Sequence, residues 1–320
     1  MKAKKAADHA FPQRIKPDAP FDLNAEVAEA YRLWPELKGN TYFIDAANNC
    51  LVHPHATKKM TDRVMKHPLV QKKLKQCKRA SRSQYYKAER MPFNVAYLYL
   101  KPGSSTLKAC PGEYSEAQSS RAIFDHELGH ALTLRTKTDA ARYGRKDLLA
   151  ETMADTFSLM RQFQRYGNDN RAIHEKKLIG LGAMMFVFGD EDQQRYFASP
   201  AMEQAVSIRD KFNYARFTPK ETVFVARGLA VKYTLPEEKL ITLKEELTDY
   251  RDILHGSARR IVATKSDEAF KWGAAAIRYA MCEDFKYQAN ARKFREKFWP
   301  GIKKEISRRE RRVKNAKPRI

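Results

Sequence analysis

The residues with the clearest capacity for chemistry lie in the pentapeptide HELGH, residues 126–130. Side chains four residues apart share one face of an α-helix, so His126 and His130 can direct two imidazole rings at a single ion. Glu127 is rotated about a quarter turn from His126, close enough to hold a water molecule on that ion without binding the ion itself. The pattern therefore predicts a metal site on a helix, with an acid beside the ion.

A catalytic zinc site usually has three protein ligands and one open position. The next helical segment, 147–163, carries Glu151 far enough beyond His130 for a loop and an antiparallel return of the chain. Asp155 lies on the same face as Glu151, where its carboxylate can accept the outer N–H of a ligand histidine. Two imidazoles and one carboxylate suit Zn2+ best among the common ions. We therefore expect two neighbouring helices to form a zinc site, with Glu151 as the third ligand.

HELGH at 126–130 and ETMAD at 151–155 match, residue by residue, the motifs of the gluzincin zinc metallopeptidases. This thermolysin-like group is defined by HExxH followed by a glutamate ligand in an ExxxD helix, and the chain resembles it over the segment that holds these motifs. The resemblance implies a zincin-like fold in which the two histidines and the glutamate hold zinc. It also implies that the strand Phe93–Leu100 is the edge of a small sheet, where an extended substrate peptide can add by strand pairing.

The expected reaction is hydrolysis of peptide bonds in a protein or peptide substrate. Zinc polarises the substrate carbonyl and makes a water molecule more acidic, while Glu127 takes the proton as general base and passes it to the leaving amine. The oxyanion needs one more donor, which gluzincins usually supply as a Tyr or His well downstream of the glutamate ligand. The alternatives here are His174, His255, Tyr143 between the site helices, and Tyr214, which we favour.

A small sheet and several helices must position these residues. The segments 41–44 and 93–100 have the β-branched and aromatic composition of strands. A first helix is expected at 23–33 with Asp22 as its cap, and the basic segment 56–90 is also expected to be helical. Further helices are expected near 119–135, 147–165, 170–188, 201–212, 219–233, 236–254, 267–281 and 284–298. The expected fold class is α+β: zincin-like, with a small N-terminal antiparallel sheet and an active-site helix, followed by a mostly helical C-terminal half.

The chain divides into four parts by composition and motif content. Residues 1–20 are polar and proline-containing and are expected to be disordered. Residues 21–166 form the expected catalytic core with both motifs, and 167–299 a helical region that completes the cleft. Residues 300–320 form a basic C-terminal tail.

Positive charge is concentrated in two segments. The chain of 320 residues has 61 Lys and Arg against 38 Asp and Glu, a net charge of +23. The segments 58–90 and 286–320 carry +10 and +11 of that charge. They indicate a polyanion partner, either nucleic acid or an acidic surface, and solvated helix faces explain them equally well.

Composition excludes several classes of protein. A hydrophobic content of 43% is too high for a wholly disordered chain. No apolar run is long enough for a transmembrane segment, and the lysine-containing start lacks the apolar part of a secretory signal. The four cysteines form no CxxC pair, which is typical of free thiols in a reducing compartment. We expect a cytoplasmic protein, with export without a cleaved signal peptide as the alternative.

A different function is also compatible with these features. The chain could be a nucleic-acid-associated or regulatory binding protein with a zincin fold, or an effector protease delivered into another cell. The basic segments favour association with nucleic acid, whereas Glu127 within HELGH favours a working peptidase.

Overall fold

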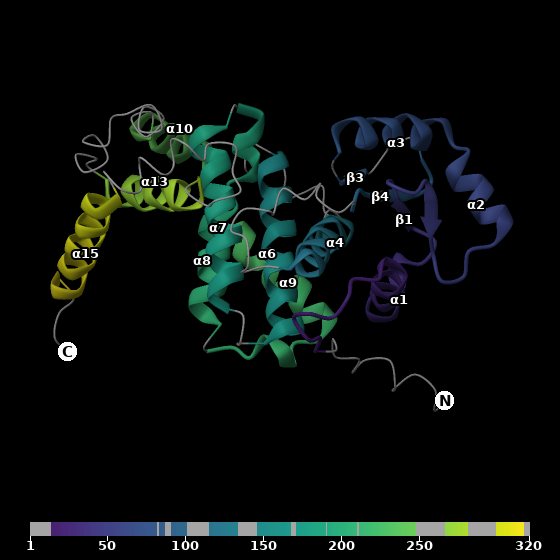
Figure 1. Ribbon diagram of the computed structural model, residues 1–320, viewed down its shortest axis with the longest axis horizontal. Coiled ribbons are helices and arrows are strands. Elements are labelled where there is room, and N and C mark those ends of the chain that lie inside the picture. The colour runs from purple at the N-terminus through teal and green to yellow at the C-terminus, as the bar shows by residue number, and fades with distance from the viewer. Residues whose placement is uncertain are drawn as a thin grey trace.

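The computed structural model describes residues 14–81, 83–86, 91–100, 115–133, 146–167, 171–189, 191–209, 211–247, 266–280 and 299–316. Figure 1 shows a small sheet with its covering helices at one end of the molecule and a body of helices that extends to the other end. The helix that carries HELGH lies between these two parts. The fold therefore mixes helices and a sheet, and helices predominate.

Four strands form one mixed sheet in the order β2-β1-β4-β3. They are β1 (Thr41–Asp45), β2 (Cys50–Val52), β3 (Gln84–Tyr86) and β4 (Asn94–Leu98). The central pair, β1 and β4, is parallel, while both outer pairs are antiparallel. The prediction of an antiparallel sheet is therefore wrong. Between β1 and β4 the chain passes through helices α2 (Lys58–Met65) and α3 (Pro68–Ala80), and a helical crossover of this kind brings the second strand back parallel to the first.

The strand predicted to be the edge of the sheet lies inside it. β4 is paired on both sides, with β1 and with β3, so the segment 93–100 does not offer a free backbone to a substrate. Among the described strands the edge on this side is β3, whose Tyr85 pairs with Ala96. β3 belongs to the segment 56–90, for which the sequence predicts helix; that prediction is confirmed for α2 and α3 only. Three residues form a strand here because β4 supplies a partner, which local composition does not reveal.

Helices cover both faces of the sheet because successive strand residues point in opposite directions. Phe43 of β1 packs in one core cluster with Phe124 of α4 (Glu116–Thr133), the helix that carries HELGH. The next residue, Ile44, packs on the other face in a cluster with Leu74 of α3. The sheet thus supports the site helix on one face and the basic helix pair on the other.

Helix α1 (Leu23–Leu33) joins the same face as α4. It begins at the predicted cap, where the Asp22 carboxylate accepts the backbone N–H of Asn24 at 2.9 Å. Its Val27 and Tyr31 are fully buried in the cluster that contains the site helix. The prediction of this helix and its cap is confirmed.

The rest of the described structure is almost entirely helical. The elements are α6 (Lys146–Tyr166), α7 (Arg171–Phe188), α8 (Ser199–Ile208), α9 (Pro219–Tyr233), α10 (Glu237–Glu246), α13 (Asp267–Ala280) and α15 (Trp299–Ala316), with short 3₁₀ helices η1 (Pro35–Leu37), η4 (Glu191–Tyr196) and η5 (Tyr214–Arg216). α4, α8 and α9 all contact α6. None of the helices in the described ranges is both long enough and apolar enough to cross a membrane.

Each helix predicted between 119 and 281 is present where the structure describes the chain, but α8 ends at Ile208 rather than at 212, and α15 is not among the predicted helices. Gly167, with a φ of +66°, ends α6, in the left-handed conformation that glycine adopts without strain. The predicted helix 284–298 lies outside the described residues, as do residues 1–13 of the predicted N-terminal segment. Most of the segment 300–320, predicted as a basic tail, belongs to α15.

A buried ion network holds α4 against α6 and α1. The fully buried Asp125 carboxylate accepts two hydrogen bonds from Arg165, at 2.9 and 3.0 Å. Arg165 also reaches Glu26 of α1 at 2.8 Å, and Glu26 accepts a hydrogen bond from Arg121 of α4 at 2.8 Å. Because Asp125 directly precedes His126, the network fixes the rotation of α4 about its axis, and with it the direction in which the histidines point.

Replacement of Asp125 by Asn should lower the free energy of unfolding by about 3–5 kcal/mol, because Arg165 keeps its buried charge and loses one carboxylate partner. Asp62→Asn is the matched control, since Asp62 pairs with Lys66 at 3.3 Å on the surface. That change should cost less than about 1 kcal/mol. Urea unfolding followed by circular dichroism measures both, and equal losses would show that the network contributes no more than a surface ion pair.

Candidate metal centre

Helices α4 and α6 touch backbone to backbone where the site lies, and a glycine makes this possible. A Cβ atom on Gly129 would lie 2.9 Å from the Cα and 3.1 Å from the carbonyl oxygen of Ala154. Both are backbone atoms of a packed helix, so neither can move aside alone. The glycine of HELGH therefore allows α6 to approach until Glu151 faces the two histidines.

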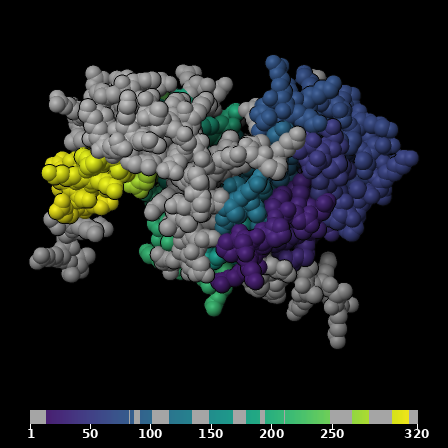
Figure 2. All heavy atoms as spheres, viewed as in Figure 1, coloured from purple at the N-terminus to yellow at the C-terminus, as the bar shows by residue number. Residues whose placement is uncertain are grey.

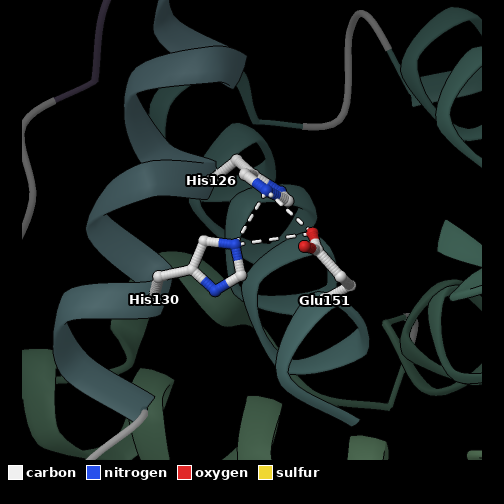
Figure 3. A group of neighbouring side chains, drawn as sticks. All are labelled: His126, His130 and Glu151. Carbon is white, nitrogen blue, oxygen red and sulfur yellow. Dashed lines mark hydrogen bonds and ion pairs between the residues drawn. The ribbon is translucent and has the colours of Figure 1, made fainter. Parts of the chain in front are cut away.

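Figure 3 shows His126 and His130 of α4 and Glu151 of α6 turned toward one another. The Nε2 atoms of the two histidines are 3.1 Å apart. Glu151 Oε2 lies 3.3 Å from Nε2 of His126 and 3.4 Å from Nε2 of His130. Within the described residues, this is the group of His, Cys, Asp and Glu side chains that could surround a metal ion. The structure thus brings together the three residues that the sequence predicts as ligands.

Asp155 sets the hydrogen-bonding state of the first histidine. Its Oδ1 lies 2.7 Å from His126 Nδ1, as the ExxxD spacing predicts. Because an ionised carboxylate only accepts hydrogen bonds, Nδ1 must carry a proton. When the ring is neutral, Nε2 then has no proton and carries a lone pair. Nε2 faces the Glu151 oxygen and His130 Nε2. One added proton lies between only two of these three atoms, whereas a metal cation at the centre contacts all three.

The spacing of the three atoms fits a zinc ion. A tetrahedral ion with ligands at about 2.0–2.1 Å separates neighbouring ligand atoms by roughly 3.3–3.4 Å. The separations here are 3.1, 3.3 and 3.4 Å. Three protein ligands, two of them imidazoles, also leave one tetrahedral position open, as catalytic zinc sites require. The residues present therefore fit the ion that the sequence predicts.

Glu127, the predicted general base, is buried beside the triad. Burial raises the pKa of Glu127 to about 7, although the positive charges of His126 and His130 lower it. The backbone N–H of Tyr85 in β3 hydrogen-bonds to the carboxylate and also favours its ionised form. Among the described residues, no partner hydrogen-bonds to its Oε2. Glu127 is thus a carboxylate that can both accept and return a proton near neutral pH.

The charges of the triad outweigh the effect of burial. Burial alone would lower the pKa of His126, but Asp155 and Glu151 raise it well above its ordinary value. Burial alone would raise the pKa of Glu151, but His130 and His126 hold it well below its ordinary value. The space between these side chains therefore strongly favours a positive charge.

Tyr214, the favoured oxyanion donor, lies away from the triad. Its ring stacks on Phe163 with a centroid separation of 5.7 Å, and its phenol donates to the backbone oxygen of Ala205 at 2.8 Å. Phe163 lies three turns beyond Glu151 on α6, about 18 Å along the helix axis. The preference for Tyr214 is therefore wrong, because this tyrosine is a core residue whose hydroxyl already has a partner. The side chains of the other candidates, Tyr143, His174 and His255, lie outside the described residues.

Tyr196, which no sequence pattern singles out, lies in η4 near the triad. Burial raises the pKa of Tyr196, and the Glu151 carboxylate raises it further, while Arg195 and His126 act in the opposite direction. Arg195 donates a hydrogen bond to the phenol oxygen at 3.0 Å, and its guanidinium carbon lies 5.0 Å from the ring centroid. Tyr196 does lie downstream of Glu151, where such a donor is expected, but no spacing rule distinguishes it from Tyr214.

No family model, no curated protein and no solved structure matches this chain. The chemistry of the site therefore follows from its geometry and from the two sequence motifs.

Replacement of Gly129 by Ala should push α4 away from α6 and lower the free energy of unfolding by about 1–3 kcal/mol. Gly228→Ala in the middle of α9 is the matched control, because nothing lies within 4 Å of its added Cβ. There the better helix propensity of Ala should raise stability by about 0.5–1 kcal/mol. Thermal unfolding of the two variants distinguishes these signs, and stabilisation by Gly129→Ala would contradict the close contact.

Proposed function

We propose that this protein is a zinc-dependent metallopeptidase of the gluzincin type with a zincin-like catalytic region. The observation that carries the proposal is the convergence of His126 Nε2, His130 Nε2 and Glu151 Oε2 at the spacing of tetrahedral zinc ligands. The buried Glu127 next to them supports hydrolysis rather than structural zinc binding, since a structural site is closed by a fourth ligand and needs no base.

Each residue of the site has a role that follows from its contacts. A bound zinc ion supplies a Lewis acid that polarises a peptide carbonyl and acidifies a water molecule. Asp155 holds the ring of His126 in the tautomer that leaves Nε2 free to bind metal. Glu127, buried beside the three ligands, takes a proton from the attacking water and delivers it to the leaving amine.

Among the described residues, we assign Tyr196 as the donor of a hydrogen bond to the oxyanion that develops on the carbonyl. It lies close enough to Glu151 and His126 for their charges to act on its phenol. Arg195 donates to the phenol oxygen at 3.0 Å and therefore holds the hydroxyl as a donor toward other groups. A fixed donor of this kind acts on the transition state without reorganisation.

The edge strand β3 gives a peptide substrate a place to bind. Its Tyr85 contacts Glu127 through the backbone and the ring of His130 through stacking, with centroids 6.1 Å apart. A peptide that lies along the outer edge of β3 would pass beside the general base, and it would pair through backbone groups other than the Tyr85 N–H, which already donates to Glu127. β3 thus takes the place that the sequence assigns to the segment 93–100.

Metal analysis of purified protein tests the ligand set. Wild type and Glu127→Gln should each hold about one zinc ion per chain, because Glu127 is not a ligand. His126→Ala and Glu151→Ala should lose it, since each removes one of three ligands.

With a fluorescence-quenched casein as substrate, Glu127→Gln should also lose at least about 10²-fold in kcat.

The panel separates metal binding from catalysis. Equal zinc content in all four proteins would end the three-ligand assignment. Full zinc in wild type with unchanged hydrolysis by Glu127→Gln would instead remove Glu127 from the reaction.

Tyr196→Phe should lower kcat by about 10²–10³-fold with little change in KM, because the lost hydroxyl acts on the transition state. Tyr214→Phe is the matched control, since it removes a buried hydroxyl that donates to Ala205. That variant should lose about 1 kcal/mol of stability and keep its kcat. Steady-state kinetics on the casein substrate compare them, and a larger loss of kcat for Tyr214→Phe would overturn the assignment.

A further inference from the structure

The C-terminal helix α15 is anchored to the body by one face only. Ile302 is fully buried in a cluster that contains Phe270 of α13. Two turns further along the helix, the guanidinium carbon of Arg309 lies 4.3 Å from the ring centroid of Phe270. Arg309 also donates hydrogen bonds to Asp267 at 2.6 Å and to Glu305 at 2.8 Å. Ile302, Glu305 and Arg309 recur at the spacing of one helical face, so the rotation of α15 against the body is fixed.

The opposite face of α15 is a cationic surface. It consists of the exposed residues Lys303, Lys304, Ser307, Arg308, Arg311 and Arg312, which we call the outer face. At 100° per residue they form two neighbouring rows with a spacing of four residues, together covering half of the helix circumference. Arg308 pairs with Glu305 at 2.7 Å, and Glu310 is the exposed acid in this part of the helix.

The charge of the outer face is unfavourable for the helix itself. Lys304, Arg308 and Arg312 lie four residues apart, a spacing at which like charges repel along a helix. Helix α10 of the same chain mixes acids and bases instead, as in Glu237, Glu238 and Lys239. The packing of Ile302 and Arg309 on α13 therefore maintains a row of like charges that the helix alone would disfavour. An anion that binds along this row would relieve the repulsion between its charges.

We propose that the outer face of α15 binds the phosphate backbone of duplex nucleic acid. An α-helix with its side chains is about 10–12 Å wide, close to the roughly 12 Å width of the major groove of B-DNA. Two rows of cations on such a helix meet the phosphates on both sides of that groove. The outer face carries no exposed apolar side chain, so it lacks the apolar surface with which an interfacial helix enters a membrane. It carries no Asn or Gln either, which favours contact with phosphates over reading of bases.

The location of α15 separates this surface from the sheet end of the molecule. In Figures 1 and 2, α15 (yellow) lies at the end of the molecule opposite the sheet and α3. Helix α3 also has exposed cations, Lys72, Lys75 and Arg79. They form one row along the helix, whereas the outer face of α15 has two. The row on α3 provides a control with the same charge change at the far end of the molecule.

Binding of the full-length protein to a fluorescein-labelled DNA duplex of about 20 base pairs, measured by anisotropy between about 50 and 300 mM NaCl, tests the proposal. The test variant is Lys303→Gln/Lys304→Gln/Arg311→Gln, and the matched control is Lys72→Gln/Lys75→Gln/Arg79→Gln. Both variants lose two lysines and one arginine from exposed helix positions. Glutamine is a good helix former, and thermal unfolding by circular dichroism checks that each variant is folded.

Wild type should bind with an affinity that falls linearly on a log–log plot against salt. The α15 variant should bind at least about tenfold more weakly at 150 mM NaCl, with a salt slope smaller by about 2.7 if three phosphate contacts are lost. The α3 variant should change less than about threefold, since it alters only the long-range field. Absence of wild-type binding at 50 mM NaCl, or equal losses in the two variants, would overturn the proposal. So would tighter binding to vesicles that contain phosphatidylserine than to the duplex.

Discussion

The candidate site depends on the contact between Gly129 of α4 and Ala154 of α6, where two helix backbones meet without an intervening side chain. A Cβ on Gly129 would lie 2.9 Å from Ala154 Cα, and the extra separation would move Glu151 away from both histidines. The spacing of the three potential ligand atoms, 3.1–3.4 Å, depends on this closeness, because each side chain reaches only a limited distance from its helix. The glycine within HELGH is therefore a geometric requirement of the candidate metal site as well as a packing residue.

Charged groups both hold the two helices together and form the candidate site between them. Asp125 and Arg165 pair within the core, while His126 and Glu151 face the site. Adjacent positions on α4 thus differ in their electrostatics. The charge of Asp125 is neutralised by Arg165, whereas the triad favours an added cation. The buried ion network stabilises the packing of α4 against α6. That packing in turn holds the ionisable side chains of the triad close together.

Local periodicity makes the residues of the candidate site predictable from the sequence. The edge strand and the tyrosine donor depend on tertiary contacts that the sequence does not reveal. The spacing of His126 and His130 and that of Glu151 and Asp155 are properties of single helices, so each pair could be placed on one face from the sequence. β3 is a strand only because it pairs with β4, and Tyr196 comes near Glu151 only because η4 packs against α6. Neither contact leaves a local signal. The choice of Tyr214 failed for the same reason, since its sequence position does not reveal that its hydroxyl bonds to Ala205.

X-ray absorption at the zinc edge of the zinc-loaded protein tests the central claim most directly. We predict a four-coordinate shell at about 2.0–2.1 Å with two imidazole nitrogens, one carboxylate oxygen and one further oxygen or nitrogen. Sulfur ligands at about 2.3 Å would place the ion at the cysteines instead. A shell of oxygen atoms without imidazole scattering would also contradict the account, because it would show that the two histidines do not hold the metal.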